Sequence, residues 1–273
     1  MANPREKVSS VDPIWTSLRQ QAEAMAAREP ALAGFVQATL LQHERLEQAL
    51  SYHLAGKLGS EDLSPLAIRE MCDTAIAADE TIGAALRADL SAVFERDPAC
   101  HSYLDAFLFY KGFHALESYR VAHWLWQEGR QAMALFLQSR ISQLFAVDVH
   151  PAAKIGRGIM FDHATGIVIG ETSVVEDDVS IMQDVTLGGT GKESGDRHPK
   201  IRRGVLLSLG AKILGNIEVG EYSRVGAGSV VLKPVPPGCT AVGVPAKLVN
   251  CDCGENPSQQ MNHYIEELPD NTG

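Results

Sequence analysis

The sequence predicts an α+β protein in which an all-helical N-terminal region precedes a β-solenoid and a polar C-terminal tail. The first observation is a six-residue period of apolar, mostly aliphatic positions from Val149 to Val231, often followed by glycine, which is typical of short stacked strands. The second is a helical spacing of apolar residues upstream of this repeat. The third is an acidic segment over residues 249–273 that contains no lysine or arginine, which predicts a mobile tail.

The helical region is expected to cover residues 1–145. Asp12-Pro13 predicts a helix start, because aspartate caps helices and proline suits the first helical position. Several of the expected helices are apolar on more than one face, which predicts contacts between subunits and therefore an oligomerisation domain. The expected helical stretches are Pro13 to about Arg28, Leu32 to Leu54, a restart at Ser64-Pro65, Ile82 to Phe94, Leu104 to Trp126 and Ala132 to Phe145.

The solenoid is expected to cover residues 146–248. Small or aliphatic residues at the fifth place of a hexad predict a second inward row, at Ala153, Ile159, Ser173, Ser223 and Ser229. The repeat should end at Lys233–Gly238, where prolines prevent further strand pairing. The main rung positions are Val149, Ile155, Phe161, Ile169, Val175, Ile181, Leu187, Ile201, Leu207, Ile213, Val219, Val225 and Val231.

Charge and composition exclude several classes of protein. The net charge of −10 argues against nucleic acid as the main partner, whereas the repeat region, with 11 basic and 11 acidic residues, is the part best suited to an anionic ligand. The sequence contains neither the apolar run of about 20 residues that a bilayer span needs nor a signal peptide, so we expect no membrane partner and a cytoplasmic protein. The five cysteines, Cys72, Cys100, Cys239, Cys251 and Cys253, do not suggest a disulfide framework, and we interpret Cys251-Asp252-Cys253 as a tail dithiol rather than a metal site.

Two interruptions of the repeat hold the candidate site residues. The first is Asp162–Gly166, which contains His163, and the second is the loop Gly188–Lys200, which contains Arg197 and His198. Loops on rigid scaffolds commonly carry function. The two interruptions offer an imidazole base, a guanidinium and a second imidazole, with Asp148 and Asp162 as carboxylates that can orient the base. His150 has two interpretations, a functional one and a cap of the first coil.

Five segments together resemble the bacterial serine O-acetyltransferases of the hexapeptide-repeat acyltransferase superfamily: residues 96–99, 111–116, 148–156, 162–166 and 191–200. The resemblance extends to about residue 248. It implies transfer of acetyl from acetyl-CoA to L-serine in cysteine biosynthesis, with acetyl-CoA as co-substrate and no metal. It also implies a left-handed parallel β-helix that trimerises with active sites between subunits, while the helical domains join two trimers into a hexamer.

The resemblance also suggests a role for each candidate. His163 is the expected general base, and Asp148 is expected to accept a hydrogen bond from the other imidazole nitrogen. Asp97 and Asp162 are expected to bind the ammonium group of serine, and Arg197 its carboxylate. His198 should polarise the thioester carbonyl or hold the carboxylate. Direct transfer in a ternary complex is favoured, because no cysteine precedes Cys239 in the repeat and no Ser-His pair is evident.

For coenzyme A, we expect the pantetheine to run along the solenoid edge near Gly189, Thr190, Leu209 and Ala227. Leu209 departs from the family pattern, because Ser208-Leu209-Gly210 stands where a run of small residues is expected. The candidate phosphate ligands, Lys233 and Lys247, have ordinary solvated surface lysines as their alternative interpretation.

The expected partners are L-serine, acetyl-CoA, L-cysteine as an inhibitor, and further copies of the chain. Family members that dock into O-acetylserine sulfhydrylase usually end in isoleucine, whereas this chain ends Pro269–Gly273, so the sequence leaves that complex open. A sugar O-acetyltransferase is the nearer alternative activity. A β-helical zinc carbonic anhydrase is more remote, because His150, His163 and His198 lie 13 and 35 residues apart and no His-x4-His occurs. A non-catalytic scaffold is the third alternative, which the intact set of candidate residues argues against.

Overall fold

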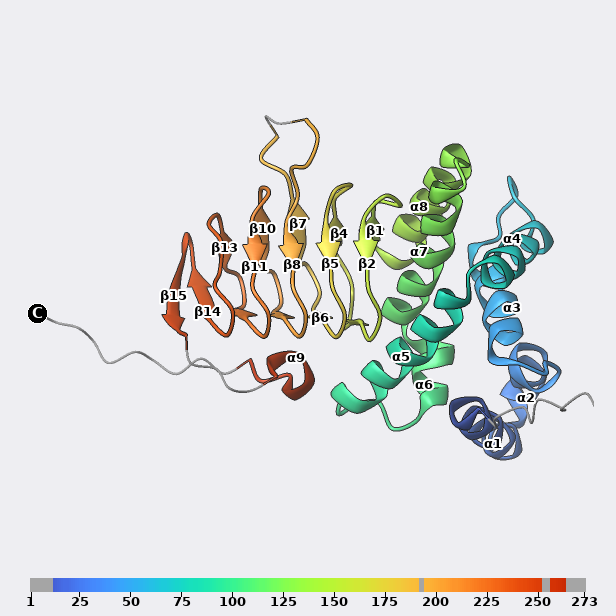
Figure 1. Ribbon diagram of the computed structural model, residues 1–273. Helices are drawn as coiled ribbons and strands as arrows, with labels where there is room; N and C mark the ends of the chain where they lie inside the picture. The colour runs from blue at the N-terminus through green and yellow to red at the C-terminus, as the bar shows by residue number, and fades with distance from the viewer. Residues whose placement is uncertain (1–11, 192–193, 252–255, 264–273) are drawn as a thin grey trace, which may run out of the picture.

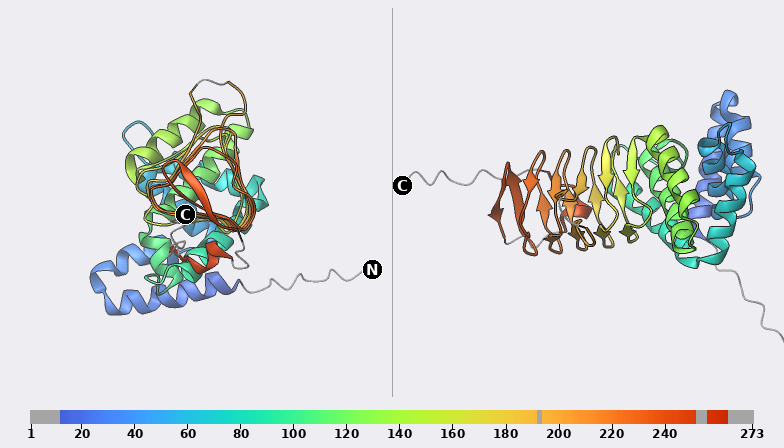
Figure 2. Two further views of the ribbon diagram at one scale, coloured as in Figure 1. Left: turned by 90° about the vertical axis from the view of Figure 1, so that its left-hand side faces the viewer. Right: turned by 90° about the horizontal axis from the view of Figure 1, so that it is seen from above.

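The computed structural model describes residues 12–191, 194–251 and 256–263. A bundle of helices stands at one end of the molecule, and a solenoid of short strands extends from it (Figure 1). Seen along its axis, the solenoid has a triangular outline (Figure 2). The expected fold class, a helical N-terminal part followed by a parallel β-helix, is therefore confirmed.

Two helices begin at the residues that the sequence predicted as their starts. The Asp12 side chain accepts hydrogen bonds from the amides of Ile14 and Trp15, at 3.1 and 3.2 Å, and Ser64 caps the fourth helix in the same way. None of the helices in the described part of the chain is both long and apolar enough to cross a bilayer. The helical elements are α1 (Pro13–Arg28), α2 (Pro30–Val36), the π-helix η1 (Gln37–Leu41), α3 (Leu46–Leu58), α4 (Pro65–Ala78), α5 (Glu80–Arg96), α6 (Tyr103–Phe109), α7 (Lys111–Gln127) and α8 (Gln131–Phe145).

Two of the expected helical stretches are interrupted. The stretch Leu32–Leu54 breaks after η1, and Leu104–Trp126 breaks at Tyr110, whose backbone is extended. The second break has a packing reason, because α7 starts directly against the solenoid. A Cβ built on Gly112 would lie 2.1 Å from the carbonyl oxygen of Phe161, so only glycine allows this approach.

The strands form three parallel sheets, one on each side of the prism. The five-stranded sheet, called sheet A here, contains β1 (Val147–Val149), β4 (Ile167–Ile169), β7 (Thr186–Gly188), β10 (Lys212–Leu214) and β13 (Val230–Val231). The four-stranded sheet B contains β2 (Lys154–Ile155), β5 (Val174–Val175), β8 (Lys200–Ile201) and β11 (Glu218–Val219). The six-stranded sheet C contains β3 (Met160–Phe161), β6 (Ser180–Ile181), β9 (Leu206–Leu207), β12 (Arg224–Val225), β14 (Thr240–Gly243) and the antiparallel β15 (Ala246–Asn250).

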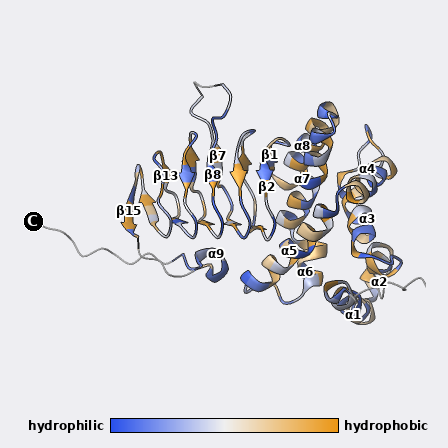
Figure 3. Ribbon diagram, in the orientation of Figure 1, coloured by the Kyte–Doolittle hydropathy of each residue, from blue (hydrophilic) through white to orange (hydrophobic). Residues whose placement is uncertain are grey.

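The six-residue rhythm determines the register of all three sheets. Val149 pairs with Ile169 in sheet A, Ile155 with Val175 in sheet B, and Phe161 with Ile181 in sheet C. All the rung positions predicted from the sequence are buried except Ile155, which is partly buried. The predicted second inward row is buried as well, including its three serines. Hydrophobic residues accordingly recur along the strands and in the helices (Figure 3).

Helix bundle and solenoid are joined through a buried ionic cluster. Arg120 on α7 forms a salt bridge with Asp89 on α5 and donates to the carbonyl oxygen of Gly156 at 2.8 Å. The second oxygen of Asp89 accepts from the Ile159 amide at 2.8 Å. Glu117 is fully buried beside them. Because these contacts bridge α5, α7 and the first coil, they fix the bundle on the solenoid.

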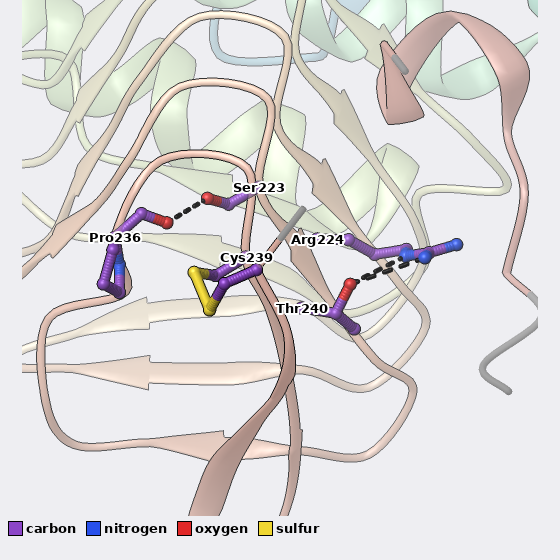
Figure 4. The surroundings of a disulfide bond; sticks show 6 residues. Ser223, Arg224, Pro236, Cys239 and Thr240 are labelled. Carbon is purple, nitrogen blue, oxygen red and sulfur yellow. Dashed lines mark hydrogen bonds between the residues drawn. A yellow bond between two sulfur atoms is a disulfide. The ribbon is translucent and has the colours of Figure 1, made fainter. Parts of the chain in front are cut away.

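The C-terminal segment differs from expectation in two respects. A disulfide joins Cys239 to Cys251 and closes the β14–β15 hairpin (Figure 4), which corrects the expectation of unpaired cysteines there; Cys253 lies outside the described residues. The pairing depends on the antiparallel return of β15, which the spacing of 12 residues does not reveal. The short helix α9 (Pro257–Gln260) packs against α5 rather than extending away, because Arg96 donates to the buried Ser258 hydroxyl at 3.1 Å.

Candidate active site

The predicted site residues occupy two corners of the solenoid. One corner lies where the strands of sheet A begin, and the other lies where they end. Asp162 and His163 lie between β3 and β4, where sheet C meets sheet A. Arg197 and His198 lie in the long loop between β7 and β8, where sheet A meets sheet B. We call the first the acidic corner (Asp97, Asp162, His163) and the second the loop corner (Glu171, Arg197, His198). One chain therefore does not bring the two imidazoles together.

His163 is exposed at the acidic corner and has a left-handed backbone with φ of 54°. Ala164, which follows, has φ of 62°. Consecutive left-handed residues other than glycine are unusual, and such strain occurs at functional sites. The turn is held by the Thr165 amide, which donates to the His163 carbonyl oxygen at 2.8 Å, and by Lys111, which bonds to the Thr165 hydroxyl.

The acidic corner gathers negative charge. Burial raises the pKa of the Asp162 carboxyl, and the Asp97 carboxylate raises it further, whereas His163 and His263 lower it. Asp97 ends α5, and its Oδ1 accepts from the Ala99 amide at 2.8 Å. Burial and the facing Asp97 raise the pKa of the Tyr110 phenol. A carboxyl group whose ionisation is disfavoured by a neighbouring carboxylate is well suited to binding a cation such as an ammonium group.

The loop corner contains a guanidinium and is held by the turn that precedes β5. Arg197 forms a salt bridge with Glu171 at 2.7 Å and donates to the Gly195 carbonyl oxygen at 3.1 Å. The Glu171 carboxyl has a lowered pKa, chiefly because of its hydrogen bond to Arg197. The guanidinium is thereby oriented and keeps further N–H donors for a carboxylate.

His198 is buried, with 7% of its surface exposed, and its ring is fixed by Thr172. Its Nδ1 accepts from the Thr172 amide at 3.2 Å and lies 2.9 Å from the Thr172 hydroxyl. Burial lowers the pKa of His198, and the neighbouring Arg197 lowers it further. An Nδ1 that accepts an amide hydrogen carries no proton, so the neutral ring has its proton on Nε2.

Asp148 and His150 lie at the start of the solenoid. Oδ1 of Asp148 accepts from Gln138 on α8 at 2.7 Å, and within the described residues Asp148 makes no hydrogen bond to His163. The Nδ1 of His150 accepts from the Ala152 amide at 3.1 Å, and its ring packs edge-on against Trp126. These contacts favour the interpretation of His150 as a cap of the first coil.

The residues expected along coenzyme A divide between the two corners. Leu209 and Ala227 stack in the column that continues the acidic corner, because the Gly228 amide donates to the Leu209 carbonyl oxygen at 2.9 Å. Leu209 is 42% exposed, so its side chain points away from the solenoid interior. Gly189 and Thr190 begin the loop that carries Arg197. Lys233 and Lys247 are exposed and lie on different sides of the prism, after β13 in sheet A and on β15 in sheet C.

The turn Gly170-Glu171-Thr172, which supports the loop corner, is not marked by any motif in the sequence. The register of the six-residue repeat could have located this turn. Because Val149 pairs with Ile169, the turns that follow each of them stack at one corner of the prism, beneath the long loop. Within residues 12–191, 194–251 and 256–263, no three His, Cys, Asp or Glu side chains cluster as metal ligands would.

Comparison with known proteins places these features in a family. Residues 14–118 match the family model described as the N-terminal domain of serine acetyltransferase. The serine acetyltransferase of Salmonella typhimurium is 58% identical over 255 residues, covering 93% of both chains. The enzyme of the same name from Haemophilus influenzae is 53% identical over 257 residues, covering 94% of this chain and 96% of the relative.

Solved structures of serine acetyltransferases have the same fold as this chain. A serine acetyltransferase in complex with cysteine has a TM-score of 0.91 and 54% identity, covering 93% of this chain and 98% of its own. A complex with coenzyme A from Brucella abortus has a TM-score of 0.87 and 52% identity, covering 88% and 96%. The soybean enzyme complexed with serine has a TM-score of 0.85 and 54% identity, covering 86% and 97%.

Proposed function

Because this chain belongs to the serine acetyltransferase family and is an acyltransferase that uses acetyl-CoA and L-serine, we propose that its active site forms between subunits. The acidic corner of one subunit faces the loop corner of its neighbour. The observation that supports this is the separation of His163 from His198 across sheet A. In a cyclic trimer this contact between unlike surfaces occurs three times, so every acidic corner faces a loop corner. The exposed residues Val168, Leu209 and Leu232 on and beside sheet A are suited to such an interface.

The chemistry begins with His163. A serine hydroxyl is a poor nucleophile until its proton is removed, and a positioned base contributes roughly 10²–10⁴-fold. His163 is exposed on a rigid turn and can accept that proton as the hydroxyl oxygen attacks the thioester carbonyl. Asp148 is the orienting carboxylate, because Gln138 occupies only one of its oxygens and the other can accept from an imidazole N–H. The protonated base then returns the proton to the departing thiolate of coenzyme A.

Both charged groups of L-serine have complementary partners. Asp97 and Asp162 bind the ammonium group at the acidic corner, where burial and mutual repulsion favour an incoming cation. Arg197 binds the carboxylate, because Glu171 directs its guanidinium and leaves donors available. The Nε2–H of His198 donates to the same carboxylate or to the carbonyl oxygen of the thioester.

Acetyl-CoA lies in the groove between the two corners. Its pantetheine follows the column of Leu209 and Ala227 on one subunit and passes Gly189 and Thr190 on the other. The phosphates are bound by Lys233 and Lys247, which are both exposed. No metal takes part in this scheme.

Three further proposals follow from the family. L-Cysteine is a competitive ligand of the serine site, because it presents the same ammonium and carboxylate groups, and its binding provides feedback inhibition. The helical bundles join two trimers into a hexamer through exposed apolar residues such as Leu32, Phe35 and Leu66. The cytoplasm is the proposed location of the reaction. The chain end that bears on a complex with O-acetylserine sulfhydrylase lies outside the described residues.

The test of the activity is thiol release from acetyl-CoA, measured with L-serine and, as controls, with maltose, a galactoside and water. We expect release only with L-serine. Release with a sugar but not with serine would instead establish the sugar acetyltransferase.

The shared site is tested by mixing two inactive variants, His163→Ala and Arg197→Ala, unfolding them together and refolding. Random trimers should regain about a quarter of wild-type activity, because one site in four combines an intact acidic corner with an intact loop corner. Each variant refolded alone should stay inactive. A mixture as inactive as its components would contradict a site between subunits.

A further inference from the structure

The hydroxyl of Thr172 joins the turn before β5 to the loop corner. Its oxygen accepts from the backbone amides of Arg197 and His198, at 3.0 and 3.1 Å. Its one proton has two acceptors nearby, Nδ1 of His198 at 2.9 Å and the Asp196 carboxylate. Nδ1 carries no proton itself, because it also accepts from the Thr172 amide.

The rest of the turn supports the same ring. A Cβ built on Gly170 would lie 2.1 Å from Cδ2 and Nε2 of His198, so the imidazole rests directly on the glycine backbone. The Thr172 carbonyl oxygen accepts from Lys200 at 2.9 Å, and Lys200 also donates to the His198 carbonyl oxygen at 2.8 Å. The turn therefore contacts the end of the long loop through the Gly170 backbone and through the Thr172 carbonyl oxygen.

We propose that Thr172 is a positioning residue for serine transfer, which fixes His198 as the Nε2–H tautomer and sets the placement of Arg197 and His198 over the substrate. This inference rests on the proposed function of the loop corner. Because Nδ1 faces the Thr172 amide and hydroxyl, the ring proton is on Nε2, where it can be donated to the carboxylate or to the thioester carbonyl oxygen. Protonation of Nδ1 would release both bonds, so the positioned form of the ring is the neutral one.

The experiment compares Thr172→Val, which keeps the shape and loses the hydroxyl, with Thr172→Ser, which keeps the hydroxyl. We expect the valine variant to lose roughly tenfold to a hundredfold in kcat/KM for L-serine, because small misplacements at a reacting centre have effects of this size. The KM for acetyl-CoA should change less than about twofold, and the serine variant should stay within about threefold of wild type. Thr74→Val on α4, whose hydroxyl bonds to the Glu70 carbonyl oxygen within its own helix, is the matched control for the same chemical change.

The pH profile separates positioning from general loss of structure. The charged and titratable groups that face His198 are Arg197, Glu171, Lys200 with its partner Asp196, and His150, and all of them are retained in every variant. Removing one donor from Nδ1 makes protonation easier, so the acidic limb of kcat/KM for L-serine should move towards neutral pH in the valine variant only.

The two failures can be told apart. Wild-type protein without serine-dependent thiol release would overturn the proposed function itself. An active wild type with equal kinetics and equal pH profiles for Thr172→Val and Thr172→Ser would overturn the role of Thr172 alone. A valine variant that loses serine and acetyl-CoA kinetics equally would also overturn it, because that pattern indicates a disordered loop.

Discussion

His53 and His114 lie edge to face, with ring centroids 4.9 Å apart, and their Nε2 atoms donate to two consecutive carbonyl oxygens at the end of α6. His53 comes from α3 and bonds to Leu108 at 3.3 Å, whereas His114 comes from α7 and bonds to Phe107 at 2.8 Å. The last carbonyls of a helix need such partners. The pair therefore stabilises the break between α6 and α7, which places Tyr110 beside Asp97.

This histidine pair predicts acid sensitivity of the bundle. Burial lowers the pKa of His53 to about 4 and that of His114 to about 3. In the unfolded chain both titrate near 6.5, so between pH 6.5 and about 4 the unfolded state binds more protons and the free energy of unfolding falls as the pH falls. Each pKa unit corresponds to about 1.4 kcal/mol, so the loss amounts to a few kcal/mol.

Urea unfolding followed by tryptophan fluorescence from pH 7.5 to 4.5 measures this loss. The double variant His53→Gln, His114→Gln should show a flatter pH dependence, whatever its stability at neutral pH. Substitution of the exposed His101 by Gln is the control and should keep the wild-type slope. An unchanged slope in the double variant would show that other groups cause the acid sensitivity.

The buried cluster at the joint makes a second prediction, about two carboxyl groups in one site. Burial and the neighbouring Asp89 raise the pKa of Glu117 well above its usual value, which favours the neutral carboxyl group. Glu117→Gln should therefore change the free energy of unfolding by less than about 1 kcal/mol. Arg120→Met leaves the Asp89 charge without its partner and should cost roughly 3–5 kcal/mol.

Equilibrium urea unfolding of both variants at pH 7 distinguishes these cases. We expect Arg120→Met to lose much more unfolding free energy than Glu117→Gln. A glutamine variant that is as unstable as the methionine variant would mean that Glu117 is ionised.

The sequence predicted the solenoid in detail because its inward positions must be aliphatic or small at fixed intervals, as Ile181 and Leu207 illustrate. It could not predict the break at Tyr110, since the apolar spacing continues through it. The failures of the repeat also made His163, Arg197 and His198 the candidate site residues, and their roles stay predictions. The support of His198 by Thr172 could not be predicted, because it depends on how an irregular loop returns to the stack.

Leu209 carries the third prediction, since it projects from the column along which pantetheine is proposed to run. Its side chain is 42% exposed and stands where a small residue is expected. Leu209→Ala should lower the KM for acetyl-CoA by about threefold to tenfold if the leucine narrows the groove, since one favourable contact corresponds to about tenfold. The KM for L-serine should stay constant.

Initial rates with each substrate varied in turn test this expectation. Leu135→Ala, at a leucine on α8 that is 44% exposed, controls for loss of a surface leucine as such. A higher KM for acetyl-CoA in Leu209→Ala would show instead that the leucine contributes a binding contact.

Gly112 carries the fourth prediction, because it seats α7 on the turn that presents the proposed base. A methyl group added there would meet the Phe161 carbonyl oxygen at 2.1 Å, one residue before Asp162. Gly112→Ala must push α7 away from the solenoid, and overpacking of this kind costs about 1–3 kcal/mol. Because Lys111 and Tyr110 move with α7, kcat/KM for L-serine should fall by at least about tenfold, since small displacements near a reacting centre have large effects.

Gly56→Ala in α3 is the matched control. Nothing lies within 4 Å of the added methyl, so this variant should raise the free energy of unfolding by about 0.5–1 kcal/mol and leave the kinetics unchanged. Urea unfolding and initial rates measure both variants, and equal behaviour of the two would mean that α7 does not position the acidic corner.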